Sequence, residues 1–415
     1  MPHVTPEIET FARIKVLGIG GSGGNAVNHM INSKVRGVEF VAINTDAQDL
    51  HRSLTKKRVN IGKNLTRGLG TGMNPEMGRR AIEDSKEEVQ EIIKGSDMVF
   101  LSGGAGGGTF SGASPVAARI AKELGALTIA VVTKPFFFEG KQRSNIAESA
   151  LNELKKEVDA IIVIPNDRLL SIVDKNTTMK NAFAICDEIL RQAVEGISDL
   201  ITTPGIINID FADVRAVLEN AGSALMGVGS ASGDNRATEA ARQAINSPLL
   251  DVSIAGAKGV LFSIAGGEDL TMFEIQDAAK VITESIDPQA KVIFGTIRDD
   301  KLKKNEIRIT VIAAGFPESS KVNAVIHAPS QKSIEDVFPT KEEKRSRIFN
   351  SFTAREPARD SVISGSPIAP PSKEAALSEP PAKEKAEEKK PVPPAKDDDD
   401  DWGAIPAFLR RSKLK

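Results

Sequence analysis

Two glycine-rich stretches contain the residue types best suited to hold a negatively charged group. The longer one runs from Leu101 to Pro115 and reads LSGGAGGGTFSGASP. It follows an apolar run and precedes a helical pattern at Ala117–Leu124. A glycine-packed turn between a strand and a helix lets backbone N–H groups crowd around an anion, and the helix dipole favours the same charge. The stretch therefore predicts a loop that binds nucleotide phosphates.

The second stretch, GIGGSGGN, contains the dinucleotide pattern GxGxxG at Gly18, Gly20 and Gly23. In dehydrogenases with this pattern, an acidic residue at the end of the next strand binds the ribose of the cofactor. That strand ends instead in NTD, and Glu39 falls near its start. Neither glycine loop carries the lysine of a GxxxxGK[ST] motif, which disfavours the common ATPase and Ras-like mechanism. Two such loops in one sheet would grip a polyphosphate from two sides, although a plain tight turn also uses glycines.

A third group of residues, in the segment NIDFADV, carries acidic chemistry. Asp210 is suited to cap a helix, and Asp213 would then lie in the favourable first turn. The same carboxylates, beside Asn208, are also of the type that supplies a general base or charge near a metal ion. The local pattern leaves both interpretations open.

Short apolar runs alternate with helical patterns in the first part of the chain, and they predict an α/β fold with a Rossmann-like parallel sheet. Their near-continuous Val, Ile, Leu and Phe content is typical of strands that are buried on both faces. Each run ends in a loop residue, at the edge where open α/β sheets bind ligands. The predicted strands are Ile14–Ile19, Val38–Ile43, Asp97–Leu101, Leu127–Val132 and Ala160–Ile164.

A long amphipathic helix is predicted from Thr177 to about Ile201, with Thr177 or Thr178 as its cap and Pro204-Gly205 as its end. Strand-like segments follow at Gly205–Ile209, Gly259–Ile264, Lys291–Ile297 and Ile307–Ala313, with helical segments at Ala212–Leu225 and Thr271–Ile286. The predicted organisation is a flexible start (1–11), a nucleotide domain (12–175), a connecting helix (176–203) and an α+β domain (204–316).

The last hundred or so residues have a different composition. Residues 317–401 are rich in Pro, Ser, Lys and Glu and end in an acidic run, which predicts a disordered linker. Residues 402–415 contain the single Trp of the chain and the segment IPAFLRR. Apolar anchors beside arginines are typical of a short peptide that orders on binding a partner. The expected contacts are Ile405, Pro406, Phe408, Leu409, Arg410 and Arg411.

Charge and composition narrow the class of protein. The chain has 54 basic and 56 acidic residues, a formal net charge of −2, so no basic field indicates a nucleic-acid partner. Its single cysteine excludes an internal disulfide framework and fits a reducing compartment. No apolar run suits a signal peptide or a membrane span. We expect a cytoplasmic protein that does not insert into the membrane.

Several motifs together resemble the FtsZ family of bacterial cell-division GTPases, within the tubulin superfamily. GGGTFSG matches the tubulin signature GGGTGTG except at Phe110 and Ser111. The segments GIGGSGGNAVNHM, NTD, GLGTGMNPEMGRRA, TKPFFFEGKQR, IPNDRL and NIDFADVRAVL are similar to those of the family and occur in its order. The resemblance covers about residues 12–316, and IPAFLRR resembles the family's partner-binding peptide.

The resemblance implies GTP and GDP as ligands and assigns a role to each matching position. The first phosphate loop is implied to contain Gly20, Gly21, Ser22, Gly23, Gly24 and Asn25. The loop around the β- and γ-phosphates is implied to contain Gly104, Gly106, Gly107, Gly108, Thr109 and Phe110. The γ-phosphate is approached by Thr45, Gly70, Thr71 and Gly72. Ribose and phosphate contacts are implied for Glu139 and Arg143, and guanine contacts for Asn166, Phe183 and Asp187.

Without the resemblance, local patterns favour simpler roles for some of these residues. Phe183 lies on the apolar stripe of its helix and would be a core residue. Asp187 would lie on a solvated face, and Glu139 with Arg143 would form an ordinary ion pair four residues apart.

The resemblance further implies that Asn208, Asp210 and Asp213 are catalytic in the nucleotide site of the next subunit. A head-to-tail contact that does not close produces filaments. In the family these filaments form the cytokinetic ring at mid-cell, on the inner face of the membrane, and the terminal peptide binds an adaptor such as FtsA. Mg²⁺ would be held mainly by phosphates and water rather than by a protein cage.

Phe110 is the departure from the signature that bears most on function. If the position needs a positive φ, a non-glycine residue costs roughly 1–2 kcal/mol, and we then expect GTP binding that is weakened but survives, with slower hydrolysis. Alternatively the position accepts a negative φ and the ring points away from the phosphates. Two other functions also remain open. One is a Rossmann-type dehydrogenase, and the other is a nucleotide-binding scaffold that polymerises but hydrolyses GTP poorly.

Overall fold

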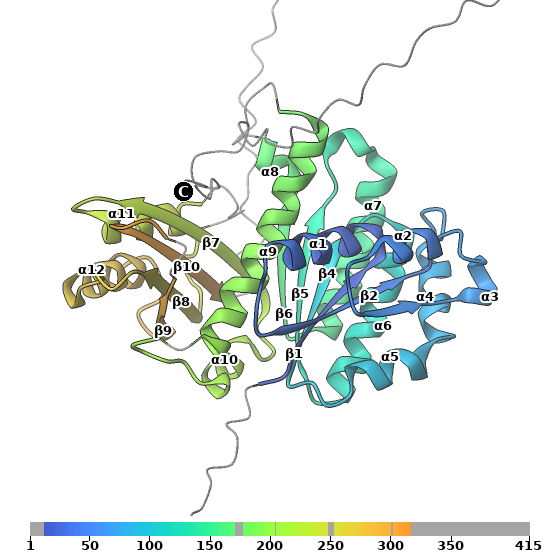
Figure 1. Ribbon diagram of the computed structural model, residues 1–415, viewed down its shortest axis with the longest axis horizontal. Coiled ribbons are helices and arrows are strands. Elements are labelled where there is room, and N and C mark those ends of the chain that lie inside the picture. The colour runs from blue at the N-terminus through green and yellow to red at the C-terminus, as the bar shows by residue number, and fades with distance from the viewer. Residues whose placement is uncertain (1–11, 171–176, 204, 248–252, 300–301, 317–415) are drawn as a thin grey trace, which may run out of the picture. The chain divides into compact units, whose positions relative to one another are not determined.

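A single ten-stranded sheet organises the computed structural model, which describes residues 12–170, 177–203, 205–247, 253–299 and 302–316 (Figure 1). The spatial order of the strands is β3-β2-β1-β4-β5-β6-β7-β10-β8-β9. The strands are β1 Ile14–Ile19, β2 Val38–Asn44, β3 Lys57–Asn60, β4 Met98–Gly104, β5 Leu127–Lys134, β6 Ala160–Pro165, β7 Gly222–Ser232, β8 Gly259–Gly266, β9 Lys291–Arg298 and β10 Glu306–Ala314.

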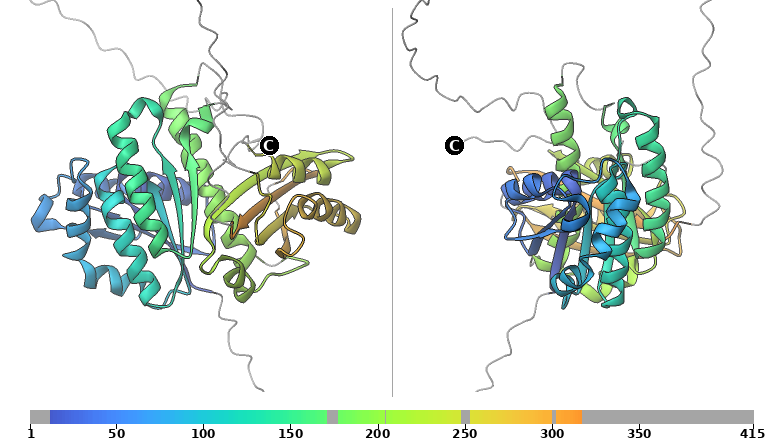
Figure 2. Two further views of the ribbon diagram at one scale, coloured as in Figure 1. Left: turned by 180° about the vertical axis from the view of Figure 1, so that it is seen from behind. Right: turned by 90° about the vertical axis from the view of Figure 1, so that its right-hand side faces the viewer.

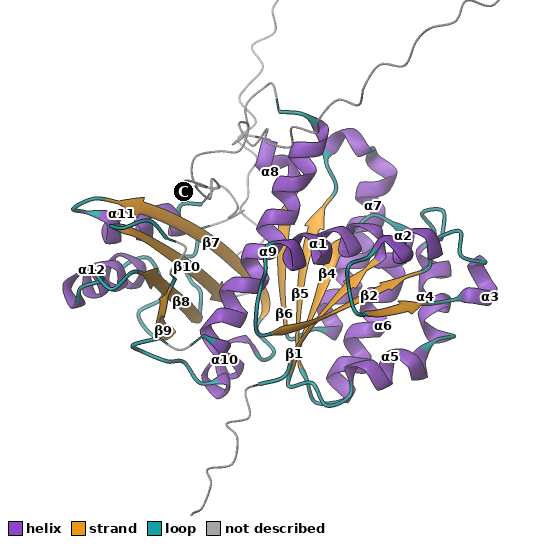
Figure 3. Ribbon diagram, in the orientation of Figure 1, coloured by secondary structure: helices purple, strands orange, loops and turns teal. Residues whose placement is uncertain are grey.

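Helices cover the faces of this sheet, as the colouring of Figure 3 makes plain. A 3₁₀ turn, Phe137–Glu139, follows β5. The helices are α1 Gly20–Asn32, α2 Ala47–Arg52, α3 Lys63–Thr66, α4 Pro75–Glu83, α5 Lys86–Ile93, α6 Gly108–Glu123, α7 Lys141–Glu157, α8 Asn166–Leu170, α9 Met179–Thr202, α10 Phe211–Leu218, α11 Arg236–Ile245 and α12 Met272–Thr283. None of the described helices is long and apolar enough to cross a bilayer.

The first six strands are all parallel, and their order reverses between β1 and β4. The chain builds outward from β1 through β2 to β3, then returns to place β4, β5 and β6 on the other side of β1. Connections leave β1 and β4 in opposite directions, and open α/β sheets bind ligands at the carboxyl ends of such a strand pair. The predicted parallel Rossmann-like sheet is confirmed, and both glycine loops lie at this reversal.

Two separate apolar cores explain why these strands are hydrophobic on both faces. Val16 and Phe100 pack on one side with α1 and α9, whereas Leu17 and Leu101 pack on the other with α4, α5, α6 and α7. Successive residues of a strand point to opposite faces, so an all-apolar strand feeds both cores. Figures 1 and 2, seen from opposite sides, show the two helical layers.

The second half of the sheet is mixed. β10 pairs antiparallel with β7 and β8, β9 runs parallel to β8, and α11 and α12 pack on one face over a third core. β7 pairs with β6 over Ala160↔Gly222 to Ile162↔Ala224. The sheet is therefore continuous between the strands that precede α9 in the chain and those that follow it. The division into domains around residues 176 and 204 therefore remains a prediction, because strands on both sides belong to one sheet.

The long helix agrees with its prediction. Thr178 caps α9 by accepting a hydrogen bond from the Asn181 N–H at 3.3 Å. The buried side of α9 begins at Ile185 and continues to Leu200. The predicted linker and terminal peptide, and residues 1–11, lie outside the described residues.

Two expectations just after α9 are wrong. The strand predicted at Gly205–Ile209 is a loop. Among the described residues, Ile207 is the only residue of this loop whose backbone bonds to β9: its N–H donates to Thr296 Oγ1 at 2.9 Å, and its carbonyl accepts from the Thr296 N–H at 3.0 Å. A single residue joined to a strand in this way does not build a ladder.

The helix predicted over Ala212–Leu225 ends at Leu218, and β7 begins at Gly222. Asn220 has φ +52° and Gly222 has φ +70°, values that stop a right-handed helix. The apolar residues of β7 continue the three- and four-residue spacing of α10, which explains the error. The strands β3 and β7 were not predicted, and no helix was specified at α2–α5, α7, α8 or α11.

Candidate functional site

Two helix N-termini lie side by side at the point where the strand order reverses. α1 begins at Gly20 directly after β1, and α6 begins at Gly108 shortly after β4, its neighbour in the sheet. Neither helix has a side chain that caps its first turn. The first-turn N–H groups of both helices therefore lack side-chain acceptors, and both helix dipoles favour negative charge at the same place. This arrangement suits a polyphosphate held from two sides.

The two glycine loops contact each other directly. Ser22 Oγ accepts a hydrogen bond from the Gly104 N–H at 2.8 Å, and Ser111 Oγ accepts one from the Gly106 N–H at 3.0 Å. Gly20 and Gly106 have φ of +71° and +100°, so these two turns require glycine. Around Gly107 a Cβ would meet nothing within 4 Å, which leaves open space for a ligand.

Three threonine hydroxyls meet beside the second loop. Thr109 Oγ1, in the first turn of α6, lies 2.8 Å from Thr45 Oγ1 and 3.3 Å from Thr71 Oγ1. The three residues come from the end of β2, the loop before α4 and the start of α6, and all are buried. Gly70 and Gly72 flank Thr71 with open space around each. The structure thus brings together the residues predicted to approach a γ-phosphate.

Helix α4 is held against α6 by glycine, and this packing positions the Thr71 loop. A Cβ on Gly112 would lie 1.9 Å from the Pro75 carbonyl oxygen, and one on Gly78 would lie 2.4 Å from the Gly108 carbonyl oxygen. The two backbones therefore approach more closely than any side chain would permit. Asn74 caps α4 by accepting from the N–H groups of the next turn, and its own backbone packs on Gly108.

A second part of the site lies between β6 and α9. Asn166 is 4% exposed, and its Oδ1 has no hydrogen-bond partner among the described residues. Phe183 is 40% exposed and contacts the buried ring of Phe136 edge-on, with ring centroids 5.4 Å apart and an interplanar angle of 88°. Phe183 is therefore not the core residue that its local pattern predicts. A buried amide acceptor and an accessible ring suit a planar polar base.

Asp187 lies one turn beyond Phe183 and is not on a solvated face. Burial raises the pKa of its carboxyl to about 6, and the nearby His29 opposes that rise. A buried carboxylate has lost hydrogen bonds to water. A ligand with two N–H donors would supply hydrogen bonds in their place.

Glu139 and Arg143 form the ion pair that their spacing predicts, with Oε2 and Nη1 2.5 Å apart. The pair also lies beside the second glycine loop, because a Cβ on Gly106 would be 2.6 Å from Arg143 Cγ. Glu139 additionally accepts from the Phe136 N–H at 2.9 Å. The ordinary ion pair is therefore compatible with the ribose and phosphate contacts that the resemblance implies for the same two residues.

Sequence reasoning missed a buried ionic network that joins α1 to α9. Burial alone would raise the pKa of Glu188, but hydrogen bonds from Arg191 and His29 lower it to about 2. His29 Nε2 lies 2.9 Å from Glu188 Oε2, and Arg191 also pairs with Glu195. The Glu188–Arg191 spacing is a usable helical signal, but the partner on α1 is not visible in sequence. The network fixes α9 relative to α1, the helix that follows the first glycine loop.

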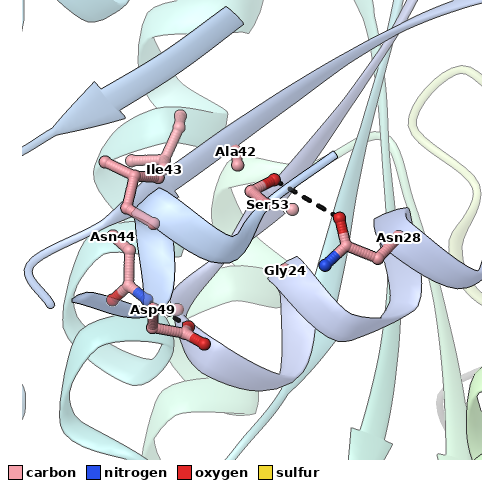
Figure 4. A pocket seen from close by; sticks show the side chains of 10 residues that line it. Gly24, Asn28, Ala42, Ile43, Asn44, Asp49 and Ser53 are labelled. Carbon is pink, nitrogen blue, oxygen red and sulfur yellow. Dashed lines mark hydrogen bonds between the residues drawn. The ribbon is translucent and has the colours of Figure 1, made fainter. Parts of the chain in front are cut away.

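The first loop is supported from behind by α2, at a small cavity of about 10 Å³ with room for one water (Figure 4). Asn44 Nδ2 donates to Asp49 Oδ2 at 2.7 Å. Burial and the neighbouring Asp46 raise the pKa of Asp49. Gly21 and Gly24 pack against Asp49, and they lie in the first turns of α1 with Gly23 and Asn25.

Asp187 provides a pH test of nucleotide-free protein. Its folded pKa of about 6 is above the ordinary value of 3.8, so the native state binds the extra proton. The free energy of unfolding should therefore fall as pH rises from about 4 to 6, by on the order of 2 kcal/mol from this group. Asp187→Asn should remove that component. Urea unfolding of both proteins across this range measures it, and identical pH profiles would contradict the assignment.

The acidic group lies far from all these residues. Asp187 lies in the first half of α9, about 22 Å along the helix axis from its last residue, Thr202, and the loop to α10 follows that end. Figure 1 shows α9 and α10. Asp210 occupies the N-cap position of α10 but makes no side-chain capping bond, and Asp213 lies in the first turn. Both carboxylates are exposed, whereas Asn208 Oδ1 accepts from the Gly205 N–H at 2.7 Å. One chain does not bring this group to its own phosphate loops.

Comparison with known proteins agrees with this geometry. The family described as Tubulin/FtsZ family, GTPase domain, matches residues 13–174, and the FtsZ family C-terminal domain matches residues 222–317. The M. jannaschii FtsZ dimer, in an empty state, is 46% identical over 74% of this chain and 89% of that chain, with a TM-score of 0.71.

Two more distant structures share the fold. They are Haloferax volcanii CetZ2 as a GTPγS-bound protofilament and CetZ1 as a GDP-bound monomer, at 21% and 24% identity. Each alignment covers 74% of this chain, and 94% and 95% of those chains, with a TM-score of 0.64. From the match with FtsZ at 46% identity, together with both family matches, the chain belongs to the FtsZ family of tubulin-like GTPases.

Proposed function

We propose that this protein is a cell-division GTPase that polymerises head to tail and hydrolyses GTP where consecutive subunits meet. The observation that carries the proposal is the split site. The residues proposed to bind the base, Phe183 and Asp187, lie in the first half of α9, whereas the exposed carboxylates of Asp210 and Asp213 lie beyond its other end. Family membership supports GTP as the substrate.

GTP would bind with its phosphates on the first turns of α1 and α6. The Asp187 carboxylate would accept from guanine N1–H and N2–H, and the unpartnered Oδ1 of Asn166 would accept a further donor from the base. Phe183 offers its accessible ring for stacking. Glu139 and Arg143 lie beside the second loop, within reach of ribose and phosphate.

Hydrolysis would need the acidic loop of the next subunit. A water attacks the γ-phosphorus, the new P–O bond replaces the bond to the β,γ-bridging oxygen, and GDP and phosphate leave. Asp210 or Asp213 would orient that water and accept its proton, while the first-turn N–H groups of α6 stabilise the charge on the leaving phosphates. Asn208, bonded to the Gly205 N–H, would hold the loop in shape.

Mg²⁺ suits the donors present near the predicted γ-phosphate. Thr45, Thr71 and Thr109 supply neutral hydroxyl oxygens, which complement a cation held chiefly by phosphates and water. Such a cation would screen the phosphate charge. Among the described residues no group of three or more His, Cys, Asp or Glu side chains is arranged to hold a metal.

Exposed apolar side chains at both ends support head-to-tail association. Leu69 and Phe137 are 82% and 89% exposed beside the nucleotide residues. Ile206 is 83% exposed beside the acidic loop, and Met272 and Phe273 are 73% and 79% exposed at the start of α12. β8 leads into α12 and lies beside the part of β9 that bonds the acidic loop. Apolar groups gathered in this way are typical of interaction surfaces.

The cellular role follows from these assignments. We infer that the filaments assemble in the cytoplasm at the division site and are attached to the membrane by an adaptor of the FtsA kind. Residues 402–415, outside the described residues, would bind that adaptor through their apolar and arginine side chains.

The experiment that tests this function measures phosphate release and sedimentable polymer in the same GTP-containing sample. Both are expected. Polymer without phosphate release would favour the scaffold. The absence of both polymer and phosphate release would overturn the proposal. Stabilisation by NAD(P) rather than by GTP would indicate the dehydrogenase.

A further inference from the structure

Phe110 occupies a glycine position of the tubulin signature, and its side chain is directed into the core. It lies in the first turn of α6 with ordinary helical backbone and is 2% exposed. It belongs to the core formed by β1, β4 and α6, together with Ile19, Leu101 and Ala113. The expected cost of a positive φ at this position is therefore absent. The structure agrees with the alternative in which the position accepts a negative φ and the ring points into the core.

The ring occupies the space that a side chain at Gly103 would need. A Cβ added to Gly103 would lie 2.3 Å from Phe110 Cδ2 and 2.7 Å from Cε2. The same added atom would lie 2.9 Å from the Ile19 carbonyl oxygen, so the gap is closed on that side by the end of β1. Carbon atoms do not approach this closely. Gly103 must therefore be glycine while Phe110 is present.

The backbone of Phe110 also lies near the first glycine loop. A Cβ on Gly20 would lie 3.4 Å from the Phe110 nitrogen and 3.8 Å from its Cβ. One residue thus packs against the start of α1, the end of β4 and the core beneath α6. These are the segments whose N–H groups would surround the phosphates.

We infer that Phe110 is a positioning residue for nucleotide binding, and that it acts as an interlocked pair with Gly103. The ring supports the two phosphate loops from below and holds the first turns of α1 and α6 at the spacing that a polyphosphate requires. This inference rests on the proposed function for its ligand. It reverses the expectation that Phe110 weakens binding, because a cavity under the loops would let both N-termini shift.

The test compares Phe110→Ala, Gly103→Ala and the double variant Gly103→Ala/Phe110→Gly. Affinity for GTP is measured on unpolymerised full-length protein, and melting temperature is measured without nucleotide. Phe110→Ala should weaken GTP binding by about tenfold or more, since displacement of binding groups by an ångström has effects of this size. Gly103→Ala should lower both quantities, because its methyl group collides with the ring. The double variant should recover part of the melting temperature that Gly103→Ala loses, because the ring no longer collides with the methyl group, whereas the close approach to the Ile19 carbonyl oxygen and the loss of GTP affinity caused by removal of the ring should remain.

Phe262→Ala is the matched control. Phe262 is fully buried in the core of α11 and α12, remote from the phosphate loops. Phe262→Ala should lower the melting temperature to a similar degree and leave GTP affinity unchanged. If Phe110 had a purely structural role, Phe110→Ala would give the same result as this control. If Phe110→Ala does not fold, Phe110→Leu replaces it, with a smaller loss of affinity expected.

Two results would overturn the inference. One is GTP affinity in the Phe110 variants as high as in the Phe262 control, and the other is a double variant whose melting temperature is no higher than that of Gly103→Ala. Failure of the wild-type protein to bind GTP would instead refute the proposed function. The recovery of melting temperature needs no nucleotide, so the steric pair is tested separately.

Discussion

Replacement of Asp210 by asparagine is expected to reduce GTP hydrolysis by at least about a hundredfold, the usual contribution of a general base, while GTP affinity stays unchanged. Asp210 is exposed, makes no capping bond and lies at the far end of α9 from the residues that would bind GTP. Its loss should therefore remove a catalytic group without altering the binding pocket of its own chain. Phosphate release and GTP binding to unpolymerised protein measure the two effects.

The control is Asp234→Asn, which neutralises another exposed carboxylate in the same half of the chain. It should leave hydrolysis unchanged, since a change in net charge alone is not the cause. Asp213→Asn should resemble Asp210→Asn if both carboxylates contact the water. Loss of GTP affinity in either variant, measured below the polymerising concentration, would argue against a role in trans.

A mixing experiment separates a site completed by the neighbour from one completed within the chain. The Asp210 variant keeps an intact nucleotide site, and an Asp187→Asn variant keeps an intact acidic loop. Copolymers contain some interfaces in which the two intact halves meet, so the mixture should release more phosphate than either variant alone. If mixing adds nothing although copolymers form, the site is not shared.

Asp187→Asn is expected to weaken GTP binding by at least about a hundredfold and to make XTP the better ligand. A carboxylate accepts from both N1–H and N2–H of guanine, and each hydrogen bond to a charged group contributes roughly 1.5–3 kcal/mol. An amide offers one acceptor and one donor, which match the N1–H and the O2 of xanthine. Thermal stabilisation by GTP, XTP and ATP ranks the ligands, and an unchanged preference for GTP would remove Asp187 from base recognition.

The pH dependence of binding provides an independent check on the same residue. Because the pKa of Asp187 is about 6 in the nucleotide-free protein, GTP affinity should fall as pH drops below about 6. The protonated carboxyl has lost an acceptor, so binding must first displace its proton. The asparagine variant should lack this dependence. Measurement of both proteins at pH 5 to 8 therefore separates Asp187 from other titrating groups.

Much of the fold could be predicted because its determinants are local. The all-apolar runs from Ile14 to Ile164 correspond to parallel strands whose alternate side chains pack into two cores. Short continuous apolar runs are typical of strands that are buried on both faces. Thr178 begins α9 because its side chain reaches a nearby N–H. β7 was missed entirely, in part because Asn220 takes a positive φ that ends the preceding helix, which its identity permits but does not require.

The candidate site was predictable where the chain itself supplies the chemistry. Glycines that follow a strand and open a helix indicate an anion site without knowledge of the rest of the fold. The residues proposed to bind the base were different, because local patterns predicted that Phe183 was a core residue and that Asp187 was solvated. The structure leaves Phe183 40% exposed and raises the pKa of Asp187, because both depend on what α9 packs against.

The sequence by itself therefore determined that two glycine-rich turns open helices at the ends of strands, since turn geometry and uncapped helix starts are set by neighbouring residues. Only the tertiary structure decided how they work together. The strand reversal places β1 beside β4, His29 of α1 meets Glu188 of α9, and the ring of Phe110 lies under both loops because Gly103 leaves space for it. Each of these contacts joins residues distant in the chain, where side-chain volume and distance, rather than spacing, decide the outcome.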